Sequence, residues 1–134
     1  MNHLFVPEKE SLELKTLGFD EPCLGLYPLA LKELIYKILP NQFEAKEYFG
    51  GVLAPLYSQV FDWFREKHSL YSYIEPVIVE HAASPIKFDY VILELNISEE
   101  IIFDTLPFHS NEKAQLACLQ KLIEIVKNDN TTRS

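Results

Sequence analysis

The chain has 134 residues, which is the size of a single domain. Hydrophobic residues make up 48% and charged residues 24%, and these ordinary values exclude a disordered chain. Twenty acidic residues against twelve basic residues give a formal net charge of −8, which opposes binding to nucleic acid and to anionic membranes. We therefore expect one soluble domain over residues 1–134, with no nucleic-acid or membrane partner.

The beginning of the chain and its cysteines predict a cytoplasmic protein. The first residues, MNHLFVPEKES, lack the basic region and the long apolar core of a signal peptide. No apolar run approaches the roughly 18 residues of a membrane helix. Cys118 lies on an apolar helix face, where a reduced and buried thiol is expected, and Cys23 is distant from it in sequence.

Two helices are predicted in the first forty residues. Pro7 suits a first helical turn and Gly18 suits the position just after a last turn, so the first helix ends at residue 17. Residues 23–27 form either a short strand or a connector. Pro28 begins the second helix and Pro40 ends it. Its apolar residues recur at helical spacing: Leu31, Leu34, Ile35, Ile38 and Leu39.

Residues 53–68 form the most strongly amphipathic stretch of the chain. Its apolar arc consists of Leu53, Leu56, Tyr57, Val60, Phe61 and Phe64, with Trp63 at the edge. Aromatic side chains bury about 150–250 Å² each, so we expect the sheet to fold onto this helix. Pro55 is tolerated only in a first turn, which places the start of the helix near Ala54.

Three strands and a helix are predicted for the rest of the chain. The strands span residues 70–79, 88–95 and 101–106, and the turns between them span 81–85 and 96–100. Pro76 makes the first strand an edge strand or introduces a bulge. Ser110 caps a helix over residues 110–127, and residues 128–134 form a frayed polar tail.

The predicted fold is therefore α+β, with elements in the order α-α-α-β-β-β-α. A three-stranded antiparallel β-meander packs against helices, with the 54–68 and 110–127 helices on one face and the two N-terminal helices beside them.

Three stretches carry a resemblance to other proteins. They are LGFDEPC at residues 17–23, APLYSQVFDWFREKHSL at 54–70 and AQLACLQKLIEIVK at 114–127. They are similar to segments of the form LGFxEPC, APxYxQAFxWFREKY and EEAxLACLxKLIEIVK in a group of small uncharacterised proteins of phages and bacterial prophages. The stretches cover under half of the chain. The resemblance implies a phage-associated protein in the cytoplasm of a bacterial host, and it implies no activity.

The sequence departs from that group at two places. The acidic capping box of the group is replaced by SNEK at residues 110–113, so the reciprocal Glu bond to the cap is lost while the Ser cap remains. Residues 27–51 match nothing in the group and are interpreted as an insertion.

Nucleic-acid recognition fits the sequence poorly. A helix, three antiparallel strands and a final helix is also the order of a double-stranded-RNA-binding domain, which needs lysines at the start of its last helix. That position holds Asn111, Glu112 and the single Lys113. The interleaved acidic and basic residues also argue against a nucleic-acid mimic.

No catalytic, metal or cofactor motif is present in the sequence. It contains no CxxC pair, no HExxH segment and no glycine-rich phosphate loop. We therefore predict no catalytic residues, no metal and no cofactor. The interpretation that the sequence favours is a protein that is not an enzyme. A hydrolase hidden in the fold stays open, and it requires that at least two of His68, His81, His109, Asp89 and Asp104 lie within hydrogen-bond reach.

The strongest candidate site is a row of tyrosines on the predicted sheet. Tyr71, Tyr73 and Tyr90 are expected to share the face that does not meet the helices, bordered by Glu75 and Lys87. Rigid rings with polar tips are typical of protein interfaces. For any single tyrosine, cross-strand packing with the hydroxyl in water is the simpler explanation.

These observations predict a non-enzymatic, phage-associated accessory protein. It would bind a host or phage protein, or assemble into a homo-oligomer, and the exposed edge strand is a second predicted contact. Two alternatives stay open. One is a protein that sequesters a nucleotide signal in a pocket between sheet and helices or between subunits, and the other is the hidden hydrolase.

Overall fold

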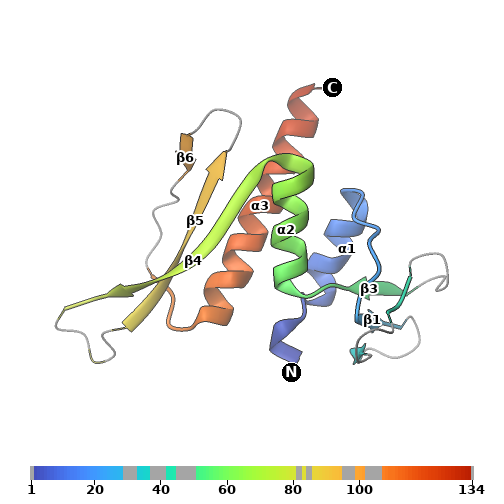
Figure 1. Ribbon diagram of the computed structural model, residues 1–134, viewed down its shortest axis with the longest axis horizontal. Helices are drawn as coiled ribbons and strands as arrows, with labels where there is room; N and C mark the ends of the chain where they lie inside the picture. The colour runs from blue at the N-terminus through green and yellow to red at the C-terminus, as the bar shows by residue number, and fades with distance from the viewer. Residues whose placement is uncertain are drawn as a thin grey trace. The chain divides into compact units, whose positions relative to one another are not determined.

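The computed structural model describes residues 2–28, 33–36, 42–44, 51–80, 83, 86–94, 99–101 and 107–133. In chain order the elements are η1 (Asn2–Leu4), α1 (Glu8–Thr16), β1 (Gly25–Tyr27), β2 (Ile35–Tyr36), β3 (Val52–Ala54), α2 (Tyr57–His68), β4 (Leu70–Ile78), β5 (Ile86–Glu94), β6 (Glu99–Ile101) and α3 (Asn111–Arg133) (Figure 1). The α+β class is confirmed. The predicted order is only partly right, because three strands lie between α1 and α2.

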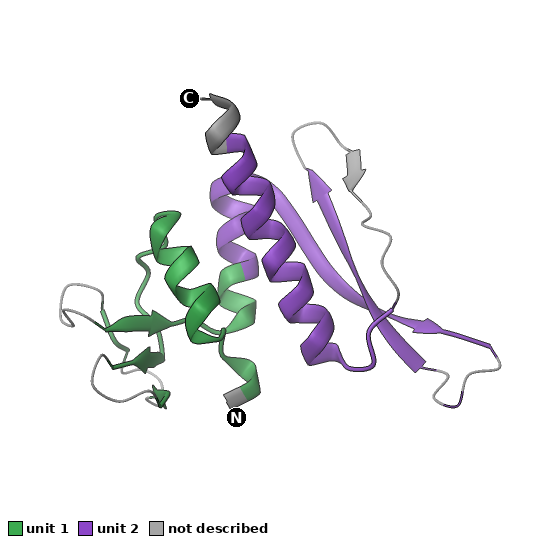
Figure 2. Ribbon diagram, turned by 180° about the vertical axis from the view of Figure 1, so that it is seen from behind, with its two compact units in different colours: residues 1–60 green, residues 61–134 purple. Residues whose placement is uncertain are grey.

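The chain divides into two compact units, residues 1–60 and residues 61–134 (Figure 2). Helix α2 contributes residues to both units. The single domain over residues 1–134 stays a prediction. None of the helices formed by the described residues combines the length and the apolarity of a membrane span.

Helix α1 ends as its sequence predicts. Gly18 adopts a φ of 101°, a left-handed conformation that glycine enters without the clash of a Cβ. The amide of Phe19 donates to the carbonyl of Leu14 at 3.0 Å, and the amide of Gly18 donates to Lys15 at 3.1 Å. These two bonds form a Schellman motif, which folds the buried Phe19 back toward the helix.

The first unit contains a small antiparallel sheet in the order β2-β1-β3. Residues 23–27, predicted as a strand or a connector, include strand β1. Gly25 lies so close to Phe5 that an added Cβ would come within 2.8 Å of the Phe5 ring. The glycine therefore allows the aromatic ring to pack directly on β1.

The predicted helix over residues 28–39 is wrong at its described positions. Ile35 and Tyr36 form strand β2, in which Ile35 pairs with Leu26. Both side chains of β2 are exposed, so the apolar residues at helical spacing do not form a buried helix face here. Ile35 is β-branched and Tyr36 is aromatic, and both residue types are common in strands. Residues 29–32 and 37–39 of this prediction lie outside the described residues. Of the predicted insertion over 27–51, Ile35 and Tyr36 pair with β1, and Phe43 pairs with Cys23.

Helix α2 begins at Tyr57 and not near Ala54. Ala54 belongs to strand β3, and the carbonyl of Pro55 accepts a hydrogen bond from the amide of Val6 at 2.9 Å. A residue that precedes proline is restricted to extended conformations, which explains why Ala54 remains in the strand. Within the helix, Val60 and Phe64 are fully buried, as the amphipathic pattern predicts.

The second unit contains an antiparallel sheet in the order β4-β5-β6, which corresponds to the predicted meander. Strand β5 begins two residues earlier than predicted. Glu99 and Glu100 were predicted in a turn but belong to β6, where they pair with Glu94 and Leu93. Residues 102–106 of the predicted third strand, and four residues of the predicted 81–85 turn, lie outside the described residues.

Pro76 lies in β4, an edge strand of this sheet as the described residues form it, which is one of the two predicted alternatives. The backbone of Phe88, directly opposite Pro76, exchanges both of its hydrogen bonds with Phe108, at 2.8 and 2.7 Å. Residues of an antiparallel ladder direct both backbone groups to the same side, so Pro76 and Phe88 form a non-hydrogen-bonded pair. The missing N–H of Pro76 therefore falls on the outer edge of β4, where it costs the sheet nothing.

Helix α3 lies along β5 and β4 and makes the main helix contact of this sheet, a role that we predicted for the 54–68 helix. Its buried residues are Ala114, Cys118, Leu119, Leu122, Ile123 and Val126. The Ser110 cap is confirmed, because its Oγ accepts a hydrogen bond from the amide of Lys113 at 3.2 Å. The helix continues to Arg133 and does not fray at residue 128, since no glycine or proline interrupts it.

Candidate functional site

Four of the five predicted site residues share one face of the second sheet. Tyr71, Tyr73 and Glu75 alternate along β4, and Lys87 lies on the same face of β5, opposite Val77. The side chains of Tyr71 and Tyr73 are 38% and 39% exposed, and their ring centroids lie 6.2 Å apart. We call Tyr71, Tyr73, Glu75, Asp89, Lys87 and Arg65 the tyrosine face.

Tyr90 does not belong to this face, so its prediction was wrong. The register places Tyr90 opposite Ile74, on the other side of the sheet, where only 4% of it is exposed. Burial raises the pKa of Tyr90, and Cys118 and Glu124 of helix α3 add to that rise. Tyr90 is therefore a core residue beneath α3. Its ring stacks on that of Phe108, with 6.4 Å between the ring centroids.

Arg65 is a member of the face that the sequence did not reveal. Its guanidinium carbon lies 5.9 Å from the ring centroid of Tyr71, within the range of a cation–π contact. Its Nη2 atom also lies 3.2 Å from Oδ1 of Asp62 on the same helix. The only available signal was its position on the polar side of α2, near the point where the chain enters β4.

The tyrosine face is open to solvent along β4 more than along β5. Val91, directly opposite Tyr73, is buried, and Leu93 opposite Tyr71 is half-buried. Glu75 and Asp89 are direct cross-strand neighbours of like charge, an arrangement that destabilises a sheet slightly. The face therefore combines exposed rings on β4 with less exposed apolar residues beside them on β5 and charged groups at its border, which is the composition of a protein interface.

The opposite face of the same hairpin ends in exposed apolar residues. Ile78 and Ile86 are directly paired at the end of the β4–β5 hairpin, and they are 77% and 57% exposed. Nearer helix α3 the same face is covered, because Leu70 and Ile92 are buried there. Figure 1 shows that this end of the hairpin extends beyond helix α3. Both isoleucines therefore lie where the helix does not cover the sheet.

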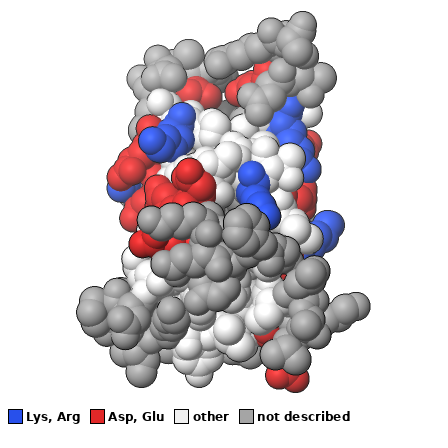
Figure 3. Space-filling view, turned by 90° about the vertical axis from the view of Figure 1, so that its right-hand side faces the viewer, with Lys and Arg blue, Asp and Glu red and all other residues white. Residues whose placement is uncertain are grey.

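Charges of both signs share the surface of the molecule. On the face drawn in Figure 3, described Lys and Arg side chains lie among Asp and Glu side chains. A nucleic-acid mimic needs carboxylates without intervening cations, at the spacing of phosphates. The described residues on that face do not provide such an array.

The two cysteines are poor nucleophiles. Both thiols are fully buried and free, and burial raises the pKa of each to about 12. For Cys23 the neighbouring Glu21 adds to this rise, as a carboxylate is expected to do. Cys118, on the buried side of helix α3, lies beside the hydroxyl of Ser72 in strand β4. Since the thiolate is the reactive form, neither cysteine is prepared for covalent catalysis.

The described members of the predicted hydrolase set have separate surroundings. His68 packs on Trp63 at 4.9 Å between ring centroids, and burial lowers its pKa. His109 Nδ1 lies 2.6 Å from Nζ of Lys87, and Asp89 accepts a hydrogen bond from the amide of Tyr90. His81 and Asp104 lie outside the described residues. Among the described residues, no group of three or more His, Cys, Asp or Glu side chains could hold a metal ion.

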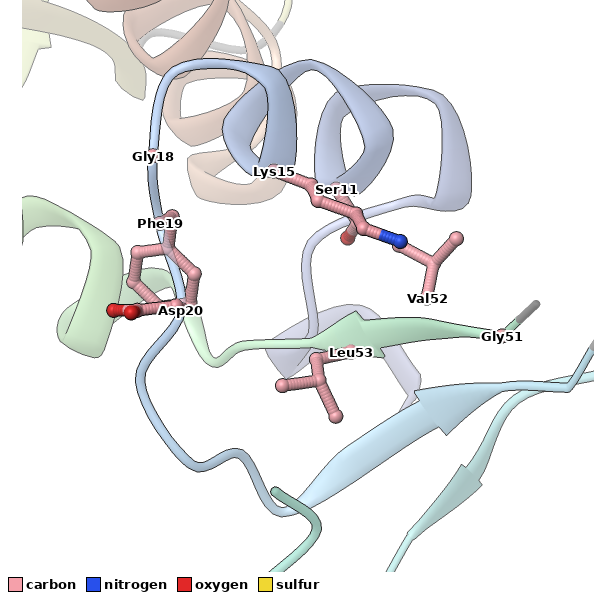
Figure 4. Close-up of a pocket in the computed structure, with 8 residues that line it drawn as sticks. All are labelled: Ser11, Lys15, Gly18, Phe19, Asp20, Gly51, Val52 and Leu53. Atoms are coloured by element: carbon pink, nitrogen blue, oxygen red, sulfur yellow. The ribbon is translucent and has the colours of Figure 1, made fainter. Parts of the chain in front are cut away.

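A cavity in the first unit was not anticipated from the sequence. It has a volume of about 270 Å³ and lies between helix α1, the turn that follows it, and strand β3 (Figure 4). Its lining residues are Ser11, Lys15, Gly18, Phe19, Asp20, Gly51, Val52 and Leu53. No single segment carries this site, and its three parts lie up to forty residues apart in sequence. No local motif could therefore have revealed it.

The cavity does not suit the predicted nucleotide signal. Among the described lining residues, Lys15 is the single basic one, and the adjoining end of α1 is its carboxyl end. Phosphate sites use several cations or the amino end of a helix, where the helix dipole is positive. A cavity with one ammonium group at the negative end of a helix is a weak phosphate site.

No protein-family model, no curated protein and no solved structure matches this chain.

Proposed function

We propose that this protein acts without catalysis, as a phage-associated accessory protein that binds a host or phage protein through the tyrosine face. The single observation that supports the proposal most is the pair of exposed rings, Tyr71 and Tyr73, on the outer face of β4. The phage association rests on the resemblance of residues 17–23, 54–70 and 114–127 to the phage-associated group.

Three features of the tyrosine face support a protein partner. Tyrosine and arginine are the residues most enriched at the centres of protein interfaces, and here Arg65 lies over Tyr71. Both rings stand on a β-strand whose register fixes their position, so they lose little entropy on binding. Val91, directly opposite Tyr73 on β5, is a buried apolar neighbour on the same face of the sheet.

The proposal is tested by removing the two rings together. We expect Tyr71→Ala/Tyr73→Ala to reduce the affinity for the partner at least about tenfold, because aromatic hot spots contribute that much to binding. The measurement is quantitative affinity capture from host cells that express the tagged protein, followed by binding titration of the captured partner. Tyr36→Ala is the matched control, because Tyr36 is an exposed strand tyrosine outside this face. Equal capture by the double variant and by the control would contradict the proposal.

Self-association is a second candidate, supported by the exposed pair Ile78 and Ile86. Strand pairing at the β4 edge is a poor route, because Pro76 removes a donor from that edge. The apolar hairpin end is the better route. We expect sedimentation equilibrium to report dimers at roughly 100 µM chain for the wild type and monomers for Ile78→Ser/Ile86→Ser. A wild type that stays monomeric over this range would rule out this candidate.

A further inference from the structure

The cavity of the first unit has walls that are fixed by independent elements. Lys15 projects from α1, Phe19 is held by the Schellman motif, and Leu53 belongs to strand β3. Strand β3 is in turn paired with β1 over three residues. Because each wall is held by hydrogen-bonded backbone, the cavity is a preformed site that needs no rearrangement to open.

The lining of the cavity combines apolar side chains with one cationic group, Lys15, one carboxylate, Asp20, and the hydroxyl of Ser11. Phe19 and Val52 are buried apolar side chains, whereas the half-buried Leu53 side chain points to the other side of β3 (Figure 4). Figure 4 shows the Lys15 side chain extended across the cavity, with its ammonium group toward Val52. The Asp20 carboxylate lies at the opposite end of the view, away from that ammonium. Lys15 forms no ion pair with any described residue, so its charge is available to a ligand.

We propose that this cavity binds a small organic monocarboxylate with an aromatic or branched aliphatic body. The carboxylate would bind the Lys15 ammonium, and the body would contact Phe19 and Val52. This role goes beyond partner binding by the tyrosine face and does not depend on it. The cavity volume of about 270 Å³ equals roughly nine water molecules at ~30 Å³ each, which suits a ligand of about ten non-hydrogen atoms.

The positive charge of Lys15 favours a monocarboxylate over a phosphate, an organic cation or a neutral molecule. A dianionic phosphate would need more positive charge than one ammonium beside the carboxyl end of α1 provides. An organic cation that occupied the cavity beside Val52 would be repelled by Lys15, since the one carboxylate of the lining, Asp20, lies away from that ammonium (Figure 4). A neutral molecule of the same shape would gain the apolar contacts but would lose the charge-assisted hydrogen bond, which is stronger than a neutral one.

Phenylacetate and phenylacetamide are matched probes for this inference, because they share size and shape and differ in charge. We expect phenylacetate to shift the backbone amide signals of Phe19 and Leu53 in NMR titrations of the whole chain. The dissociation constant should be about 0.1–1 mM, the range for a ligand of this size with modest efficiency. Phenylacetamide should bind several-fold more weakly, and benzylamine should not bind.

Two variants separate the charge from the cavity itself. Lys15→Gln should weaken phenylacetate binding about three- to fivefold, because Lys15 is exposed and its ion pair is screened by water. It should leave phenylacetamide binding unchanged. Lys9→Gln is the matched control, an exposed lysine of the same helix that does not line the cavity. Val52→Phe, which enlarges the side chain that points toward Lys15, should fill the cavity and abolish binding of both probes, while far-ultraviolet circular dichroism confirms that the variant folds.

Three results would overturn the inference. They are equal affinity for phenylacetate and phenylacetamide, an unchanged phenylacetate affinity in Lys15→Gln, and no shifts at Phe19 and Leu53 up to 10 mM phenylacetate. None of these results bears on partner capture by the tyrosine face, so the two proposals fail separately.

Discussion

Gly18 determines where helix α1 stops and where the cavity begins. Its φ of 101° is a conformation that costs other L-residues energy, and the Schellman bonds of the motif depend on it. The next residue, Phe19, forms one wall of the cavity. A single backbone conformation therefore links the end of a helix to the shape of a candidate binding site.

Substitution at this position tests that link. We expect Gly18→Ala to lower the free energy of unfolding by about 1 kcal/mol in urea denaturation. The cost comes from the backbone alone, because no heavy atom lies within 4 Å of an added Cβ. Gly18→Asn should lose less, since asparagine enters the left-handed region more readily. An alanine variant as stable as the wild type would show that the Schellman turn is not under conformational strain.

At the scale of elements, the β4–β5 hairpin divides its residues strictly between two faces. Odd-numbered residues of β4 pair with odd-numbered residues of β5, so Tyr71 and Tyr73 face one way and Tyr90 faces the other. Alternation in the sequence predicted both strands, and the proline at position 76 predicted that β4 is an edge strand or carries a bulge. It could not predict the register, because register depends on the length of the connection between the strands. This is why two tyrosines of the predicted site share a face and the third is buried.

The errors in the first half of the chain have a related cause. Residues 28–39 have apolar residues at helical spacing, but pairing with β1 places Ile35 and Tyr36 in a strand. Local periodicity was outweighed by a tertiary contact that a single sequence does not display. Short strands of two or three residues, such as β2 and β3, carry too little pattern to be recognised. The helix caps at Gly18 and Ser110 were predicted correctly, because a cap depends on residues that are near in sequence and not on tertiary pairing.

At the scale of the whole molecule, each compact unit carries one candidate binding site. The first unit holds the cavity, and the second holds the tyrosine face. The α+β class and most of the second unit could be predicted from the sequence. The cavity could not, because it exists only once α1, its terminal turn and β3 are brought together. Arg65 was missed for the same reason, since its contact with Tyr71 joins two elements.

The central claim is that the exposed rings of β4 contact a protein partner, and the most direct test is site-specific photocrosslinking in host cells. A photoreactive phenylalanine would replace Tyr73 in one variant and Tyr36, the exposed control, in another. We predict a discrete crosslinked adduct with another protein from position 73 and none from position 36. Adducts from both positions alike, or none from position 73 while the protein is folded and expressed, would contradict the account.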